Sequence, residues 1–258
     1  MRRFVYDYTQ GPDQSIIKQV TAHLQLDAAP PIAYAQTAKV IDTMATFFRE
    51  KEAISLTMHL FINESGGLTV SSPILQFDDS AFKSAKRQES MFALRDTSVE
   101  EAAEVEAEKH GIVFIKLSPD DASANIGTLV NGAGLAMNTI DALSLAPHHG
   151  KCSNFLDTGG KATSETVKKS FELILQDERV KVIFVNIFGG LTDCGMIADG
   201  VILAFKEVDM RGLPVVVRLR GTREEVGQRK IAESGLDLEA FDGFQEAAAR
   251  VVEIARGG

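Results

Sequence analysis

The chain has 258 residues, of which 45% are hydrophobic, a formal net charge of −9 and two cysteines. This length and composition are enough for one large or two small globular domains with a proper core. The negative charge argues against nucleic acid or an anionic membrane as a partner, because both require a basic surface. Two cysteines make neither a disulfide framework nor a metal-ligand pattern, and no apolar run reaches the roughly 18 residues of a membrane span.

The first hundred residues show no alternation of strands and helices. Helical spacing predicts two helices, around Gln14–Leu26 and Ala33–Lys51. The glycine-containing turn Glu64–Gly67 predicts a β-hairpin after them, and a charged stretch follows. These residues are typical of a separate α+β segment.

A domain boundary is expected near residue 98. The stretch Thr97–Glu101 has the capping-box pattern, with Ser98 as the N-cap and Glu101 at the N3 position of a helix. We therefore assign residues 1–97 to the first domain and residues 98–258 to the second.

From Ile126 onward, short β-branched runs alternate with helical patterns. This alternation predicts β-α-β units and a parallel sheet with helices on both faces. The successive strand and helix segments are IGTLV and GLAMNTIDALSLA, NFLD and SETVKKSFELILQ, VKVIFVNI and CGMIADGVILAFKEV, LPVVVRL and REEVGQRKIAES, before a last helix FQEAAARVVEIA. VIFVNI and PVVVRL are apolar with almost no alternation, as expected of strands buried on both faces. The second domain is therefore predicted to be α/β.

Glycine-bearing turns follow three of these strands, at Asn131–Gly134, Asp157–Gly160 and Gly189-Gly190. In an open parallel sheet, ligands gather beyond the carboxyl ends of the strands. Helix N-termini begin there with unpaired N–H groups, and glycine lets an anion approach the backbone. The three turns together predict one phosphate or carboxylate site. The alternative is that they are only tight strand-to-helix connections.

Four blocks resemble, in order, the carboxy-terminal domain of the β subunit of succinyl-CoA synthetase (succinate–CoA ligase). They are VNGAGLAMNTID, NFLDTGGKAT, VNIFGGLTDCGMIADGV and VVVRLRGTREEVGQRKIAESGL, and the resemblance covers about Ile126 to Val252. It implies a flavodoxin-like domain that pairs with an α subunit, which carries CoA and a transiently phosphorylated histidine. The helix after Gly189-Gly190 would point its N-terminus at that phosphohistidine. The resemblance places the protein in the cytoplasm or mitochondrial matrix, and no targeting segment is visible.

The same resemblance suggests which residues would bind the substrate. Asn131 matches the asparagine that the family uses for succinate. Gly190, Leu191 and Thr192 match its succinate-contacting stretch, and Gly189 lies in the same turn. Succinate or phosphate is therefore the candidate ligand of this turn, whereas CoA and the phosphohistidine are expected on the α partner and no cofactor on this chain.

Several positions in this domain depart from the family pattern or invite a second interpretation. Lys161 replaces a usual glycine and is either an anion clamp or a solvated lysine at a helix start. Arg220 replaces a glutamate. Asp193 replaces a usual arginine, which adds negative charge beside the proposed anion site. Cys194 is predicted at a helix start, where the pKa of a thiol is lowered, although the family does not use this cysteine as a nucleophile. The pair His148-His149 is either a phosphate-accepting or metal-binding pair or, more commonly, a solvated loop.

The amino-terminal residues resemble only the later portion of the family's ATP-grasp domain, so we interpret them as a partial, degenerate ATP-grasp remnant. By this resemblance, the adenine pocket, the phosphate-binding lysine and the glycine loop are expected to precede the portion of the family domain that these residues match. Leu56 stands at the position of the glutamate that serves the phosphohistidine. Met58 occupies the position of the asparagine that binds magnesium, and His59 that of the proline after it. Ser72 occupies the position of the aspartate that binds magnesium. Magnesium requires hard oxygen ligands, normally with a carboxylate among them. We therefore expect neither a metal site nor a nucleotide site.

Three functions stay open at this point. The first is a β-like subunit that acts as a structural or regulatory partner of an α subunit. The second is an active half-ligase that assists exchange between phosphohistidine and succinyl-CoA. The third is a sensor that binds a carboxylate or an acyl phosphate. The lost metal residues and Asp193 favour the first, and Asn131 with the Gly189-Gly190 turn favours the second.

Overall fold

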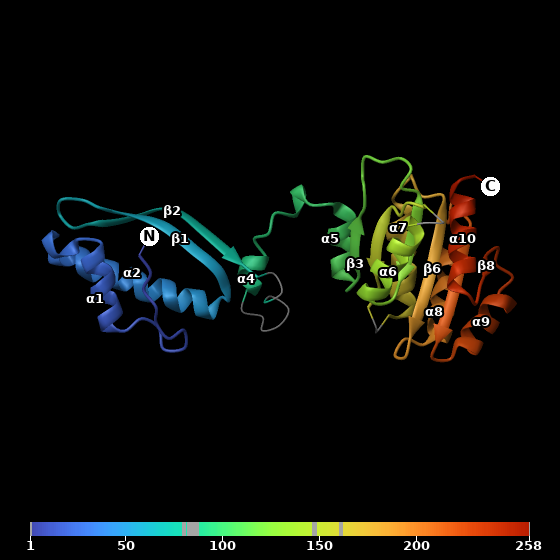
Figure 1. The fold of residues 1–258 in the computed structure, drawn as a ribbon, viewed down its shortest axis with the longest axis horizontal. Helices are drawn as coiled ribbons and strands as arrows, with labels where there is room; N and C mark the ends of the chain where they lie inside the picture. The colour runs from blue at the N-terminus through green and yellow to red at the C-terminus, as the bar shows by residue number, and fades with distance from the viewer. Residues whose placement is uncertain (1, 79–80, 82–87, 146–148, 160–161, 258) are drawn as a thin grey trace. The chain divides into compact units, whose positions relative to one another are not determined.

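The structure is a computed structural model that describes residues 2–78, 81, 88–145, 149–159 and 162–257. The chain divides into two compact units, Met1–Arg95 and Asp96–Gly258, which are shown in Figure 1. Within the described ranges, none of the helices is both long and apolar enough to cross a membrane.

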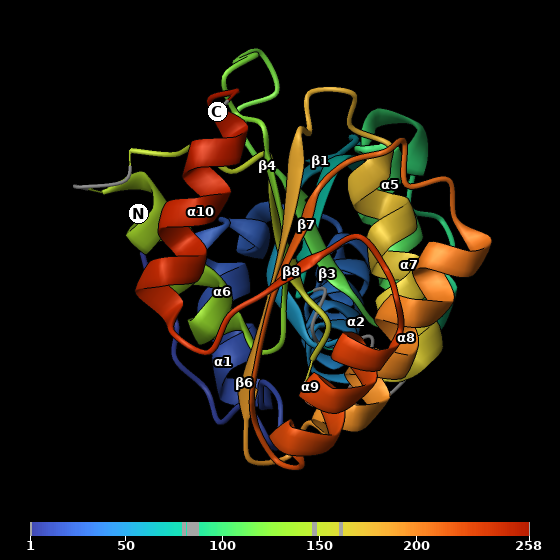
Figure 2. The same ribbon diagram turned by 90° about the vertical axis from the view of Figure 1, so that its right-hand side faces the viewer.

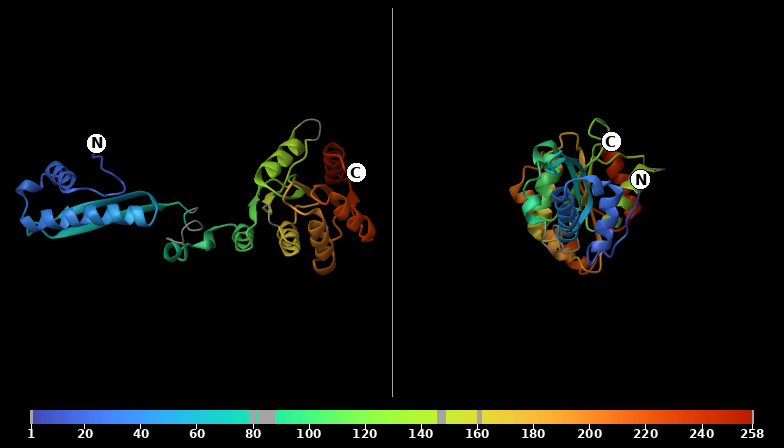
Figure 3. Two further views of the ribbon diagram at one scale, coloured as in Figure 1. Left: turned by 90° about the horizontal axis from the view of Figure 1, so that it is seen from below. Right: turned by 90° about the vertical axis from the view of Figure 1, so that its left-hand side faces the viewer.

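The first unit is a helix packed along a two-stranded hairpin, as Figure 3 shows. The long helix begins with proline at its first position, where the missing N–H costs no hydrogen bond. The antiparallel strands pair from end to end except at two register shifts. The elements are α1 (Gln14–His23), the 3-10 helix η1 (Leu26–Ala28), α2 (Pro31–Glu50), β1 (Ala53–Ile62), β2 (Leu68–Phe77) and the short α4 (Glu89–Phe92). Both predicted helices and the hairpin are present.

The second unit is a six-stranded sheet between two layers of helices. Its elements are η2 (Thr97–Val99), α5 (Ala102–Lys109), β3 (Val113–Lys116), β4 (Ile126–Val130), α6 (Ala133–Ser144), β5 (Asn154–Asp157), α7 (Ser164–Leu175), β6 (Val182–Gly189), α8 (Cys194–Glu207), β7 (Val215–Gly221), α9 (Glu224–Glu233), β8 (Glu239–Ala240) and α10 (Phe244–Ala255). The four strands and five helices that alternation predicts after Ile126 are all formed.

The strand order is β3-β5-β4-β6-β7-β8. The five strands from β4 to β8 are parallel and, numbered along the chain, lie in the order 2-1-3-4-5 of flavodoxin-like folds. This order confirms the expected fold. The sequence did not indicate β3, an antiparallel edge strand, or the two-residue β8. The outer edge of β3 is partly covered, because the Lys116 N–H donates to the Glu104 carboxylate at 3.0 Å.

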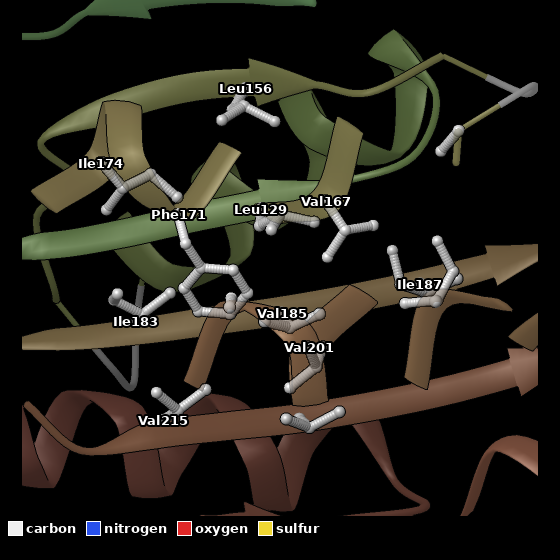
Figure 4. Close-up of a cluster of buried hydrophobic side chains, with 14 of the residues drawn as sticks. Leu129, Leu156, Val167, Phe171, Ile174, Ile183, Val185, Ile187, Val201 and Val215 are labelled. Carbon is white, nitrogen blue, oxygen red and sulfur yellow. The ribbon is translucent and has the colours of Figure 1, made fainter. Parts of the chain in front are cut away.

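Hydrophobic side chains fill both faces of the sheet. Phe171 and Val185 belong to the larger cluster, which also includes residues of α5, α8 and α9, and Figure 4 shows part of it. Phe184 lies in the second cluster, together with residues of α6 and α10. Figure 2 shows α6 and α10 on one side of the sheet and α5, α7 and α8 on the other. Strands β6 and β7 are therefore buried on both faces, as their apolar sequences predict.

The predicted capping box at Ser98 is wrong. Ser98 lies within η2, and its N–H and hydroxyl both donate to the Asp96 carboxylate, at 3.0 and 2.6 Å. The next helix, α5, begins only at Ala102, and Glu101 precedes it without a side-chain capping bond. Asp96 caps η2 in place of Ser98, because an aspartate is at least as good an N-cap as a serine and it precedes Ser98 in the chain.

Candidate functional site

The candidate site lies where the strand order reverses. Strands β4 and β6 are neighbours, yet β5 lies between them in the chain. A crevice for ligands forms at the carboxyl ends of two such strands. Asn131 directly follows β4, and the turn Gly190–Thr192 directly follows β6. The fold thus brings together residues that are about sixty positions apart in the sequence.

Asn131 bridges the two strand ends. Its side-chain carbonyl accepts from the Phe188 N–H at 3.0 Å, and its Nδ2 donates to the Phe188 carbonyl at 3.3 Å and to Thr192 Oγ1 at 2.9 Å. Asn131 is 7% exposed and Thr192 is 2% exposed. The Asn131 side chain therefore extends the hydrogen bonding between β4 and β6 beyond the end of β4. Both N–H groups of its amide already donate to acceptors within the protein.

The glycines of the turn have different roles. A Cβ on Gly189 would lie 3.1 Å from Asn131 Nδ2, so this glycine allows the amide to approach the backbone. Gly190 has open space around its Cα and no positive φ. Among the described residues, the N–H groups of Gly190, Leu191 and Thr192 have no acceptor. Leu191 itself is 91% exposed. The turn therefore presents free backbone donors beside an exposed apolar side chain.

The N-terminus of α8 is occupied by the chain's own carboxylate. Asp193 is the N-cap, and its Oδ1 accepts from the N–H groups of Gly195 at 2.7 Å and Met196 at 3.2 Å. Its Oδ2 pairs with Arg223 at 2.7 Å. Although desolvation opposes the change, the Met196 and Gly195 donors together with Arg223 lower the pKa of Asp193. The group is thus an anion seated where an external anion was expected.

The lowered thiol pKa expected for Cys194 is wrong. Cys194 is fully buried, and burial, followed by the charges of Glu224 and Asp193, raises the pKa of its thiol. The second cysteine, Cys152, is also buried, which raises its pKa to about 12. Position at a helix start does not make a thiol reactive when carboxylates and apolar packing surround it.

The other two glycine turns meet through a second carboxylate. Gly132 is the N-cap of α6, with φ +92 and no side-chain capping bond. Its N–H donates to Asp157, whose Oδ1 also accepts from Gly159 at 2.7 Å. Hydrogen bonds of Asp157 and Asn131 therefore link the ends of β5, β4 and β6. The carboxylates of Asp157 and Asp193 accept from backbone N–H groups in this region, which the glycine pattern did not indicate.

Of the remaining candidates, Arg220 is engaged with carboxylates, His149 is exposed, and the others lie outside the described residues. Arg220 pairs with Glu224 at 3.4 Å and Asp242 at 3.8 Å. His149 is exposed with φ +52. His148, Gly160 and Lys161 lie outside the described residues.

The first unit shows what surrounds Leu56, Met58 and Ser72, which the resemblance places at the family's phosphohistidine and magnesium residues. Met58 lines a largely apolar groove between the hairpin and α2, with Val40, Met44, Leu68 and Val70, and its lining also includes Gln36, Lys39 and Thr43. Leu56 lines a second groove, whose other residues include Ile41, Met44 and Phe48. Ser72 is exposed, at a register shift, with φ +49. These residues do not fit magnesium, since Leu56 and Met58 supply no oxygen and Ser72 no carboxylate. In the part of the chain that the structure describes, no group of three or more His, Cys, Asp or Glu side chains could hold a metal ion.

Comparison with known proteins identifies the family. Residues 129–252 match the CoA-ligase family model. The mitochondrial β subunit of ADP-forming succinate–CoA ligase from Saccharomyces cerevisiae is 36% identical over 99% of this chain and 58% of its own length. The corresponding subunit from Sinorhizobium medicae is 39% identical over 97% of this chain and 60% of its own length. The chain is a relative of succinate–CoA ligase β subunits.

This β-subunit relative spans about 60% of the length of the curated proteins it matches. Its fold also matches a solved structure of ATP citrate lyase from Methanothrix soehngenii in complex with citrate and coenzyme A. The TM-score is 0.65, with 16% identity over 90% of this chain and 61% of the other. At that identity the match supports the fold alone.

Proposed function

We propose that this chain acts as a succinate–CoA ligase β-like subunit that has no nucleotide or magnesium site of its own. It would be the structural or regulatory partner of an α-like subunit that carries CoA and the phosphohistidine. The observation that carries the proposal is the packing of apolar side chains where the resemblance puts the phosphohistidine glutamate and a magnesium asparagine of the family. Met58 and Leu56 line grooves against α2, and burying a hydrated ion against such side chains is strongly unfavourable.

The surface around the candidate site supports a protein partner. Phe188 is 56% exposed and Leu191 is 91% exposed, and both lie at the carboxyl end of β6. Aromatic and aliphatic side chains exposed together are typical of surfaces that a partner covers. By analogy with its yeast and bacterial relatives, we place the complex in the mitochondrial matrix or the cytoplasm.

The deciding experiment is purification of the tagged full chain from its native source, followed by calorimetry. We expect an α-like ligase subunit to copurify, and we expect the chain alone to bind no Mg-ATP. Micromolar binding of Mg-ATP, which corresponds to roughly −8 kcal/mol, would contradict the loss of the nucleotide site. Recovery of a monomer without an α-like protein would contradict the partner role.

An active half-ligase is the second candidate. The free N–H groups of Gly190, Leu191 and Thr192 favour it, since they could still bind succinate or phosphate beside Asn131. Its test is turnover of a phosphorylated α partner with the wild-type chain and with Gly190→Val. The substitution fits the open space at Gly190 but places a branched side chain over these donors. A fall in turnover of at least tenfold with an unchanged melting temperature would support the half-ligase, and equal turnover would exclude it.

A further inference from the structure

We infer that Asp193 is a specificity-determining residue that excludes external anions from the N-terminus of α8. Its carboxylate, held by Arg223, fills the position that a phosphoryl group would otherwise take. The inference deepens the proposed function and rests on it in one respect, namely that the turn after β6 faces the partner's reacting group.

The first evidence is that α8 has no free donor in its first turn. The Cys194 N–H donates to the Thr222 carbonyl at 3.0 Å, and the Ile197 N–H donates to the Asp193 carbonyl at 3.1 Å. The Gly195 and Met196 N–H groups both donate to Asp193 Oδ1. An anion could therefore reach the helix dipole only by displacing the Asp193 carboxylate.

The second evidence is that Arg223 fixes the other oxygen of this carboxylate. Arg223 precedes α9 in a left-handed conformation, with φ 57, and its Nη1 lies 2.7 Å from Asp193 Oδ2. Helices α8 and α9 approach closely here, because a Cβ on Gly227 would lie 2.5 Å from the Cys194 carbonyl. This packing brings Arg223 to Asp193, and a charge-assisted bond from a guanidinium is stronger than a neutral one.

The third evidence is that the charges around the helix start balance without a ligand. Arg223 is paired with Asp193, and Arg220 is paired with Glu224. The Glu224 carboxylate also accepts from the Gly221 N–H at 2.6 Å. A phosphate that entered would meet two carboxylates whose counter-charges are already engaged. The electrostatic balance therefore disfavours a dianion at this helix start.

The test is binding of inorganic phosphate to the full chain, measured by amide chemical shifts and calorimetry. Asp193→Ser keeps a good N-cap without the charge and releases Arg223. We expect it to bind phosphate at least tenfold more tightly than wild type, with shifts at the Gly195 and Met196 amides. Adding Arg223→Gln should remove most of the gain. Asp209→Ser changes the net charge equally elsewhere, beyond the end of α8, and should change affinity less than twofold.

Equal phosphate affinity in wild type and Asp193→Ser, with both proteins folded in thermal melts, would overturn the inference. So would a gain of the same size in Asp209→Ser, since net charge alone would then explain it. Both outcomes are independent of the partner. Failure to recover an α-like subunit refutes the proposed function and leaves the phosphate result as it stands.

Discussion

The two units of the molecule differ in how they bury apolar surface. In the second unit, helices cover both faces of a six-stranded sheet, and the largest fully buried side chains, among them Phe171 and Phe184, all lie there. In the first unit, one long helix packs on a two-stranded hairpin, and Ile54, Phe61 and Ile74 of the hairpin are each more than half exposed. Two strands are marginal on their own and depend on what packs against them.

This difference shows that the same chain can contain one fold that is complete in its packing and another that is not. The second unit matches the CoA-ligase model over residues 129–252, and its sheet satisfies the rules of the flavodoxin-like order. In the first unit, Met58 and Leu56, at positions where the resemblance suggests polar family residues, line grooves with residues of α2.

The largest expected effect is a cavity in the second unit. Phe171→Ala removes a fully buried ring, and we expect it to lower the free energy of unfolding of that unit by about 3–5 kcal/mol. Phe61→Ala in the first unit removes a ring that is 58% exposed, and it should cost less than about 1 kcal/mol. Denaturant unfolding followed by amide signals from each unit measures both values. Equal costs would break the comparison between the units.

A smaller effect is expected where the ends of β6 and β7 touch. Gly221 has φ +115, and a Cβ there would lie 2.3 Å from the Gly189 carbonyl oxygen. Gly221→Ala should therefore destabilise the second unit by about 1–3 kcal/mol, through strain and overpacking. The matched control is Gly190→Ala, which meets no atom within 4 Å and should stay within about 0.5 kcal/mol of wild type. Similar melting temperatures for the two variants would refute the close approach.

In the first unit, restoring a family residue should carry a modest cost. Met58→Asn places an amide in the apolar groove beside Val40 and Met44, and we expect it to cost about 1–3 kcal/mol because the amide loses water. Ser72→Asp, at an exposed position, should change stability by less than about 0.5 kcal/mol. The measurement is the unfolding transition of the first unit. If Met58→Asn leaves the stability of the first unit unchanged, the groove is accessible to water and Met58 has no packing role.

The smallest expected effect is a pH dependence on the surface of the second unit. Lys169, followed by Lys109 and His110, lowers the pKa of Glu106 from 4.5 to about 2. A lowered folded-state pKa adds stability that is fully present above the unfolded value and is lost as the pH falls from about 4.5 towards 2. Glu106→Gln should therefore melt slightly earlier than wild type at pH 7, and the difference should vanish near pH 2.

The control for this series is Glu233→Gln, whose glutamate is exposed on α9 and for which the described ranges show no ion pair. Its melting temperature measures the effect of removing a glutamate carboxylate that forms no such ion pair. A difference for Glu106→Gln that does not shrink below pH 4.5 would exclude the ion pairs as its cause.

The sequence predicted the second unit well because burial on both faces leaves a strong pattern. The apolar runs that became β6 and β7 and the helical repeats after them are long enough to identify without tertiary information. Strand β3 was missed because four residues between charged segments carry little periodicity. Strand β8 was missed because two residues carry none. Their pairing depends on long-range contacts.

The candidate site was predictable in place but not in chemistry. Glycines after strands located the turns, and the structure joins them through Asn131 and Asp157. Aspartate directly before a helical pattern is a strong N-cap signal, so the position of Asp193 in the sequence could have indicated that it fills α8. Its pairing with Arg223 could not be predicted, since the two residues are thirty positions apart. The buried state of Cys194 likewise depends on the packing of α9.

The edge of β3 has a consequence for how the molecule associates. A free strand edge is a template on which another chain can add a strand, and long rows of such pairing lead to fibres. Here the edge strand has four residues, and the Glu104 carboxylate takes the Lys116 donor that would begin such a row. At the other edge, β8 offers only two residues. Growth of this sheet from molecule to molecule is thus hindered at both ends, because one edge is partly covered and the other is only two residues long.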